Sequence, residues 1–181
     1  VVGSSALARL DSDAEPLLPT ESLAYPLMGK GERFPFLAPA ALGFCDAPAS
    51  QEALRFAARL QGVAFVERLA YEALDRVSGQ AARGDVFATG GGSASEVWMQ
   101  LRADVSGRTL HRPECHESAF GSAILAAANT IHDGLWDAMG RMLVIERSFH
   151  PDPLRGSTYD ELFGAFRHRL AQHGYLEAHG E

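Results

Sequence analysis

Apolar residues between positions 50 and 79 recur three, four or seven apart along the chain: Phe56, Leu60, Val63, Ala70, Leu74 and Val77. This spacing predicts one long helix with these side chains on its buried face. Ser50 is suited to cap its start, and Gly79 is suited to the left-handed conformation that ends a helix. Gly62 lies in the middle and weakens a helix by about 1 kcal/mol relative to alanine. We therefore expect another element to approach the helix closely at Gly62.

The first 49 residues have a different pattern. They hold six of the nine prolines of the chain, namely Pro16, Pro19, Pro26, Pro35, Pro39 and Pro48. Because each proline biases the residue before it away from helix, residues 25–39 are predicted to be extended with tight turns. Residues 3–11, "GSSALARLD", could start a short helix. We interpret residues 1–49 as a loop-rich leading segment and residues 50–181 as an α/β core.

Within the core, strand and helix patterns alternate. "DVFAT" (85–89) and "RTLHR" (108–112) are predicted strands, and a helix between them places Val97, Leu101 and Val105 on one face. Residues 117–130 predict a helix of small residues that could pack closely on a sheet. Residues 157–174 predict a last helix, with Thr158 and Glu161 at the spacing of a capping box. This alternation favours a parallel α/β layer within a single domain. Two strands are too few for it, so further strands are expected from the leading segment or from chain outside this sequence.

Composition and charge narrow the class of protein. The 181 residues are 46% hydrophobic and 22% charged, and the net charge is −7. An acidic chain without a basic cluster argues against nucleic-acid binding, and the longest apolar run is too short to span a membrane. Cys45 and Cys115 form no close pair, which favours a reducing, cytoplasmic location. The chain starts Val1-Val2-Gly3 without methionine, so we expect it to be part of a longer parent.

Three consecutive glycines, Gly90 to Gly92, separate the first predicted strand from the helix after it. Ser93 and Glu96 have capping-box spacing and predict a helix start just beyond the glycines. Such a turn presents unpaired backbone N–H groups and the positive end of a helix dipole, as nucleotide and phosphate sites do. The glycines alone are equally compatible with a tight turn that binds nothing.

Two nucleotide-binding motifs can be compared with this loop. The P-loop requires a lysine after its last glycine, and no lysine follows Gly92 in the chain. The dinucleotide-binding fingerprint matches Gly90 and Gly92, but Ser95 stands where the third small residue belongs. Glu114 lies roughly where the acid that binds ribose would be. An NAD-binding oxidoreductase domain of the Rossmann type therefore remains an alternative.

The residues around the glycines resemble those of a known family. Four segments, in order along the chain, are similar to the C-terminal domain of the FGGY family of carbohydrate kinases: "GERFPFLAPAALGF", "LQGVAF", "ATGGGSASEVWMQLRADVSGRTLHRPECHESAFGSAILAA" and "PDPLRGSTYDELFGAFRHRL". The resemblance extends from about Tyr25 to Leu170. An ordered set of this kind is far more specific than the glycines alone.

The resemblance implies a fold and a site. The fold would be α/β, a ribonuclease H-like or actin-like ATPase domain with three α/β/α layers that lacks its first strands. Gly90, Gly91 and Gly92 would lie against ATP, and Ser95 would contact its adenosine part. The start of the first helix, at Gly3 and Ser4, would also approach the nucleotide.

The resemblance also implies what completes the enzyme. The parent would transfer the γ-phosphoryl group of ATP, with Mg²⁺, to a hydroxyl of a sugar or polyol. Most carbohydrate contacts and the catalytic aspartate belong to an N-terminal kinase domain, so no catalytic residue is assigned here and this chain alone is expected to be inactive. A non-catalytic α/β interaction module is a further alternative. His111, Cys115 and His116 lack a second ligand cluster and are not expected to bind zinc.

Overall fold

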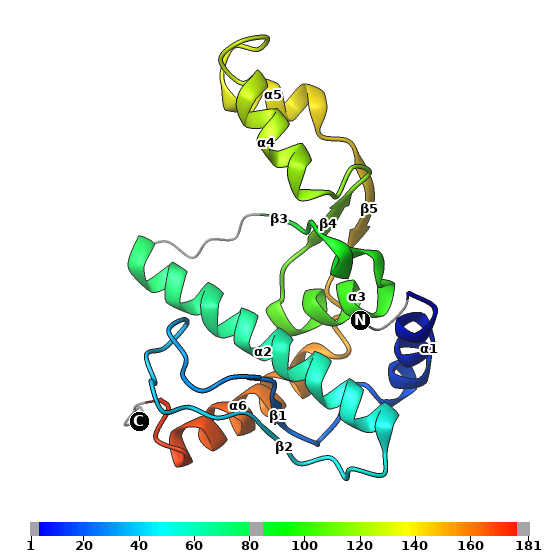
Figure 1. The fold of residues 1–181 in the computed structure, drawn as a ribbon, viewed down its shortest axis with the longest axis vertical. Coiled ribbons are helices and arrows are strands. Elements are labelled where there is room, and N and C mark those ends of the chain that lie inside the picture. The colour runs from blue at the N-terminus through cyan, green and yellow to red at the C-terminus, as the bar shows by residue number, and fades with distance from the viewer. Residues whose placement is uncertain (1–3, 80–84, 177–181) are drawn as a thin grey trace.

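The computed structural model describes residues 4–79 and 85–176. Its elements in chain order are α1 (Ser4–Ala14), the short 3-10 helix η1 (Glu15–Leu17), β1 (Ala24–Tyr25), β2 (Phe44–Cys45), α2 (Glu52–Ser78), β3 (Val86–Phe87), the 3-10 helix η2 (Gly91–Ala94), α3 (Glu96–Ser106), β4 (Leu110–Pro113), α4 (Ser118–Ala127), α5 (Leu135–Met142), β5 (Ile145–Phe149) and α6 (Gly156–Gln172). Helix α2 crosses the middle of the molecule, with α1, α3, α6 and the β1–β2 ribbon around it (Figure 1).

Helix α2 confirms the predicted long helix and only part of its predicted face, since Phe56 and Leu60 pack partly buried against the core. It begins after Gln51 rather than Ser50, and it ends at Gly79 with φ 65°. The buried positions are mostly small residues on another side, Ala57, Ala58, Gln61, Gly62, Ala64, Phe65 and Leu69. Leu74 and Val77 are 51% and 88% exposed because the last turns of α2 extend beyond the core. The apolar spacing therefore predicted the helix correctly, but the side of α2 that packs most closely against its neighbours is the side with the small residues.

The leading segment is fastened to α2 at two places. The side chain of buried Gln61 accepts a hydrogen bond from Thr20 N–H at 3.0 Å and donates one to Thr20 O at 2.8 Å. One residue on, a Cβ at Gly62 would lie 2.0 Å from Ala24 O in β1. The close approach predicted at Gly62 is therefore confirmed, and the element that approaches is β1.

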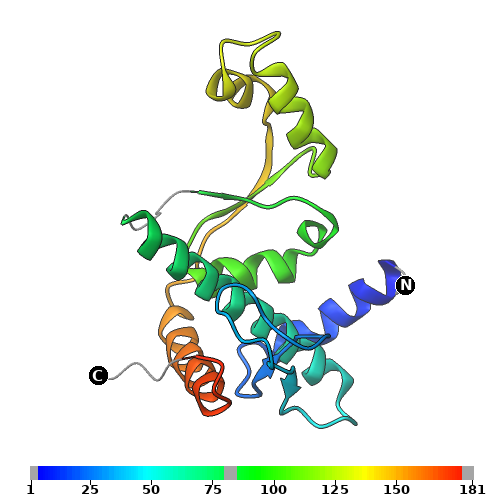
Figure 2. The same ribbon diagram turned by 60° about the vertical axis from the view of Figure 1, so that its left-hand side comes forward.

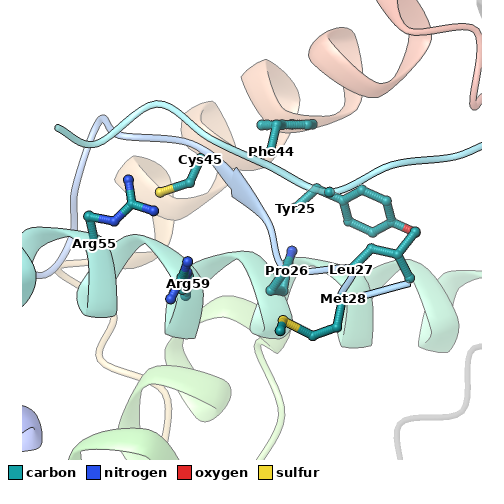
Figure 3. Close-up of a pocket in the computed structure, with 9 residues that line it drawn as sticks. Tyr25, Pro26, Leu27, Met28, Phe44, Cys45, Arg55 and Arg59 are labelled. Atoms are coloured by element: carbon teal, nitrogen blue, oxygen red, sulfur yellow. The ribbon is translucent and has the colours of Figure 1, made fainter. Parts of the chain in front are cut away.

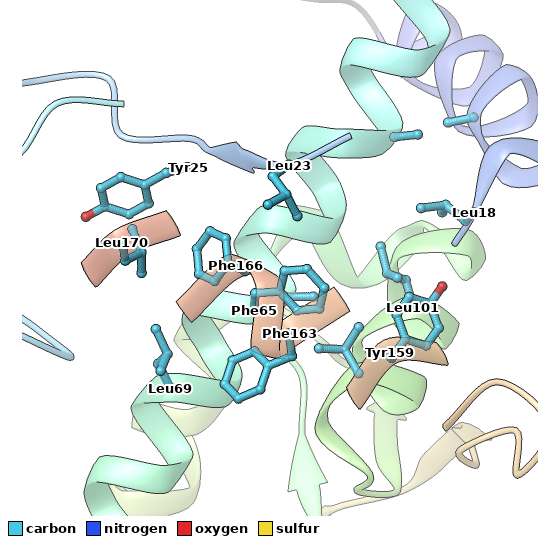
Figure 4. Packing of buried hydrophobic residues seen from close by; sticks show 14 of the residues in the cluster. Leu18, Leu23, Tyr25, Phe65, Leu69, Leu101, Tyr159, Phe163, Phe166 and Leu170 are labelled. Atoms are coloured by element: carbon cyan, nitrogen blue, oxygen red, sulfur yellow. The ribbon is translucent and has the colours of Figure 1, made fainter. Parts of the chain in front are cut away.

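The main hydrophobic core lies between α2, α3, α6 and β1. Phe65 of α2 lies 5.7 Å from Phe163 and 5.3 Å from Phe166 of α6, measured between ring centroids. Figure 4 shows these rings with Leu101 of α3 on one side and Tyr25 of β1 on the other. Since α6 supplies rings to this core, the last helix closes the domain against the long central one.

The three-stranded sheet is only partly as predicted. Its order is β3-β4-β5, and the pair β3–β4 is parallel, as expected for a strand-helix-strand unit. The pair β4–β5 is antiparallel, because β5 returns along β4 after the α4–α5 hairpin. Strand β5 itself was not predicted. The early strands β1 and β2 form a separate antiparallel ribbon, so they do not enlarge the sheet.

Two helices differ from expectation at their ends or in their packing. Helix α6 starts at Gly156 after Arg155, with no side-chain cap, so Thr158 and Glu161 lie inside the first turns and form no capping box. Helix α4 does not lie on the sheet. It packs on α5 through Ile124, Ala128 and Ala138, and the two helices project beyond the end of the sheet (Figure 2). Among the described residues, no helix combines the length and hydropathy needed to cross a bilayer.

A buried carboxyl group lies where α3 meets the start of α6. The side chain of Asp104 is 0% exposed. Its Oδ1 accepts hydrogen bonds from Asp152 N–H at 2.9 Å and from Gln100 Nε2 at 2.8 Å. Its Oδ2 has no hydrogen-bond partner within the described chain, and Arg155 Nη1 is 3.8 Å away. Burial raises the pKa of Asp104 above its ordinary value of 3.8.

The variant Asp104→Asn is expected to be more stable than the unaltered chain at neutral pH, by about 1 kcal/mol, because it removes a buried charge and keeps the Oδ1 acceptor. With a raised folded-state pKa, the neutral carboxyl stabilises the fold fully below the unfolded value near 3.8. That contribution is lost as the pH rises through the folded-state pKa. Denaturant unfolding from acid to neutral pH should show the advantage of Asp104→Asn vanishing at low pH. Asp133→Asn, at an exposed position, should show no such trend, and a pH-independent difference for Asp104→Asn would refute the assignment.

Candidate functional site: the glycine loop

The glycine loop is held by its own backbone and by the next loop of the sheet. Gly90 has φ 87°, a conformation that favours glycine. Its N–H donates to His116 O at 2.6 Å, and its carbonyl accepts from Ser93 N–H at 3.1 Å. Ser93 Oγ donates to the same carbonyl at 2.7 Å. Gly90 therefore anchors the loop, and its N–H group is not free for a ligand.

The helix after the loop starts later than predicted. Residues Gly91–Ala94 form the 3-10 helix η2, so Ser93 belongs to that turn and not to a capping box. Ser95 is the N-cap of α3, and its Oγ accepts from Trp98 N–H at 3.1 Å. The Glu96 carboxylate pairs with Arg147 of β5 instead of reaching back to the cap. The predicted capping box of Ser93 and Glu96 is thus wrong, and Ser95 has the capping role.

A cavity of about 430 Å³ opens beside this loop. Its walls come from α1, α2, the glycine loop and the start of α3, through Leu7, Ala8, Asp11, Phe56, Leu60, Gly91, Gly92, Ala94, Ser95 and Trp98. Three of the residues predicted from the sequence, Gly91, Gly92 and Ser95, therefore line one cavity. Gly90 does not line the cavity and instead anchors the loop through its hydrogen bond to His116 O.

The chemistry of the cavity suits a nucleoside with a phosphate chain. Leu7, Phe56, Leu60 and Trp98 offer apolar walls to a flat ring. Asp11 is a carboxylate that can accept hydrogen bonds from sugar hydroxyls. The N–H groups of Gly91 and Gly92 have no backbone acceptor among the described residues, and a Cβ at Gly91 would meet nothing within 4 Å. Backbone N–H groups exposed in this way are donors for phosphate oxygens.

Helix α1 supplies residues that the sequence reasoning missed. Leu7, Ala8 and Asp11 share one face of α1 at the i, i+1, i+4 spacing. That spacing was visible in the sequence, but nothing local indicated what the face would meet. Ser4 begins α1 one turn before Leu7, while Gly3 lies outside the described residues. Their contact with a nucleotide stays a prediction.

Glu114 lies at another site. Together with Cys115, His116 and Glu117 it borders a cavity of about 480 Å³ that shares no lining residue with the glycine-loop cavity. It is therefore not positioned as the ribose-binding acid of a dinucleotide site. His111 on β4 has Nδ1 2.8 Å from Ser148 Oγ. Among the residues that the structure describes, no three His, Cys, Asp or Glu side chains group as metal ligands.

Comparison with known proteins identifies the family. A sequence model described as the FGGY family of carbohydrate kinases, C-terminal domain, matches residues 3–130. The L-xylulose/3-keto-L-gulonate kinase of Escherichia coli is 32% identical over 85 residues, which are 46% of this chain and 17% of that kinase. The autoinducer-2 kinase of Salmonella paratyphi B is 33% identical over 121 residues, which are 64% of this chain and 22% of that kinase.

The solved structures agree. The xylulose kinase from Rhodospirillum rubrum has a TM-score of 0.75 and 26% identity, and the match covers 94% of this chain and 35% of that kinase. The predicted α/β fold of the actin-like type is confirmed by this likeness, and the Rossmann alternative gains no support. The chain spans only a minor part of each relative's length. It belongs to the FGGY family of carbohydrate kinases, as a C-terminal domain of that family.

Proposed function

We propose that the glycine-loop cavity binds ATP. The observation that carries this proposal is the convergence of Gly91, Gly92 and Ser95 with the apolar face of α1 on one cavity. In this arrangement the adenine ring lies between Leu7 and Trp98, Asp11 accepts a hydrogen bond from a ribose hydroxyl, and the N–H groups of Gly91 and Gly92 donate to the phosphate chain. Phosphoryl transfer depends on such positioning and on charge stabilisation.

We further propose that this domain works with an N-terminal kinase domain in an ATP-dependent carbohydrate kinase. The reaction would move the γ-phosphoryl group to a hydroxyl of a sugar or polyol, and the relatives' family supports that class. No cluster of three candidate metal ligands is present among the described residues, and Mg²⁺ in nucleotide sites is held by the phosphates and only one or two carboxylates. Mg²⁺ would enter with the nucleotide and be held mainly outside this domain. A cytoplasmic location belongs to the same proposal, supported by two free cysteines.

Titration of the chain with ATP and with NAD tests the nucleotide assignment. ATP is expected to bind at least about tenfold more tightly than NAD, because the cavity beside the loop has no second lobe among its lining residues for a nicotinamide half. A preference for NAD would favour a dinucleotide-binding domain. Binding of neither nucleotide would favour an interaction module without a ligand.

A second measurement addresses catalysis. The isolated chain, mixed with ATP, Mg²⁺ and a panel of sugars and polyols, is expected to form no sugar phosphate, because no catalytic aspartate is assigned to it. Turnover by the isolated chain would contradict this part of the proposal and leave the nucleotide assignment in place.

A further inference from the structure

A separate cavity lies between α2 and the β1–β2 ribbon. It has a volume of about 290 Å³, and its walls include Arg55, Arg59, Leu27, Met28, Phe44 and Cys45. Figure 3 shows Arg55 extending from α2 toward Cys45, Arg59 farther along α2, and Leu27 and Met28 beyond it. The cavity therefore has a cationic end and an apolar end.

The two arginines are short of anionic partners. Arg55 Nη1 donates to the carbonyl of Ala47 at 2.9 Å, and among the described residues this is the one hydrogen bond of its guanidinium group. The side chain of Arg59 has no hydrogen bond or ion pair among the described residues. A guanidinium carries five N–H donors, so most donors of this pair are unused. Arginines four apart on a helix also repel each other, and a bound anion would relieve that repulsion.

The nearby carboxylates are engaged elsewhere. Glu52, one turn before Arg55, pairs with Arg9 at 3.5 Å, and Asp46, next to Cys45, pairs with Arg169 at 2.8 Å. Of the residues that the structure describes, no acidic one lines the cavity itself. The chain as a whole has a net charge of −7, whereas the described lining of this cavity carries two positive charges and no negative one.

We propose that this cavity binds a small phosphomonoester, with its phosphate on Arg55 and Arg59 and a compact apolar or aromatic group against Pro26, Leu27 and Cys45. A dianionic phosphate matches two guanidinium groups in charge, and each guanidinium can donate two parallel hydrogen bonds to its oxygens. The apolar wall favours an ester over the free phosphate ion, because burial of a small ring adds hydrophobic free energy.

This site is independent of the proposed ATP site. The two cavities share no lining residue, since one lies beside α1 and the glycine loop and the other under the β1–β2 ribbon. The phosphate chain of a nucleotide in the glycine-loop cavity therefore does not account for the two arginines. The proposal holds whether or not the chain binds ATP.

Calorimetric titration of the chain with phenyl phosphate, inorganic phosphate and phenol tests the site. Phenyl phosphate is expected to bind most tightly and inorganic phosphate more weakly, with no binding of phenol. Arg59→Gln should weaken phenyl phosphate binding by about tenfold or more, because it removes charged hydrogen bonds. The Arg59 side chain is exposed and has no partner in the part of the chain that the structure describes, so this variant should fold normally, which its thermal unfolding would show.

Arg76→Gln is the matched control, since Arg76 lies on the same helix, is exposed and is outside the cavity. It should leave phenyl phosphate binding within about twofold of the unaltered value. Equal losses in Arg59→Gln and Arg76→Gln would show a diffuse charge effect and overturn the proposal. So would binding of phenol as tight as that of phenyl phosphate, or the absence of phenyl phosphate binding to the unaltered chain. Gly91→Val, which fills the other cavity, should not change the phenyl phosphate titration.

Discussion

Replacing Gly62 with alanine is expected to destabilise the domain by about 3 kcal/mol or more, although alanine is the better helix former. The new Cβ would lie 2.0 Å from Ala24 O and 2.9 Å from Ala24 C, and both are backbone atoms of β1. The clash can be relieved only if α2 and β1 move apart, and this would open a packed contact because Ala24 is only 1% exposed. Separation would also strain the hydrogen bonds between Gln61 and Thr20. Since folded domains are stable by about 5–15 kcal/mol, the loss is a large part of the total.

Gly164→Ala gives the matched comparison. Gly164 lies in the exposed part of α6, and a Cβ there would meet nothing within 4 Å. This variant is expected to gain up to about 1 kcal/mol from helix propensity alone. Denaturant unfolding of both variants should show a lower free energy of unfolding for Gly62→Ala and a higher one for Gly164→Ala. Equal stabilisation by both substitutions would mean that β1 does not lie against α2 at Gly62.

The same glycine illustrates how far the sequence could predict the fold. A glycine inside a long apolar-periodic segment correctly indicated a close neighbour, but it could not identify β1 as that neighbour. The predicted face of α2 was wrong in part, because Leu74 and Val77 look like core residues by spacing while their turns extend past the core. The burial of a helix residue depends on how far the elements packed against the helix extend, and the local apolar spacing does not contain that information.

The candidate site shows the same limit. The three glycines and Ser95 were correctly associated with one loop, since their signal is local. The helix start was misplaced because a 3-10 turn at Gly91–Ala94 delays α3, and S-x-x-E spacing cannot distinguish the two starts. Asp11 and the pair Arg55 and Arg59 were missed. Each of them lines a cavity together with elements that are distant in the sequence, which are the glycine loop and α3 for Asp11 and the β1–β2 ribbon for the arginines.

Replacing Gly91 with valine is expected to weaken ATP binding by about a hundredfold while leaving the fold intact. Gly91 lines the glycine-loop cavity and is exposed, so the valine methyl groups would occupy the space in which the phosphate chain meets the loop N–H groups. The backbone can accept the change, because Gly91 has no positive φ and a Cβ there would meet nothing within 4 Å. Loss of binding with an unchanged melting temperature would separate a ligand role from a structural one.

Gly90 and Gly164 provide the two controls for that experiment. At Gly90 any side chain is strained by φ 87° and ψ 174°, so Gly90→Ala should lower stability by about 1–3 kcal/mol even without ligand. At Gly164 a valine adds the same bulk far from the cavity and should leave ATP binding unchanged. If Gly91→Val binds ATP as tightly as the unaltered chain, the phosphate chain does not lie on this loop. The glycines would then serve only the turn that Gly90 anchors through His116.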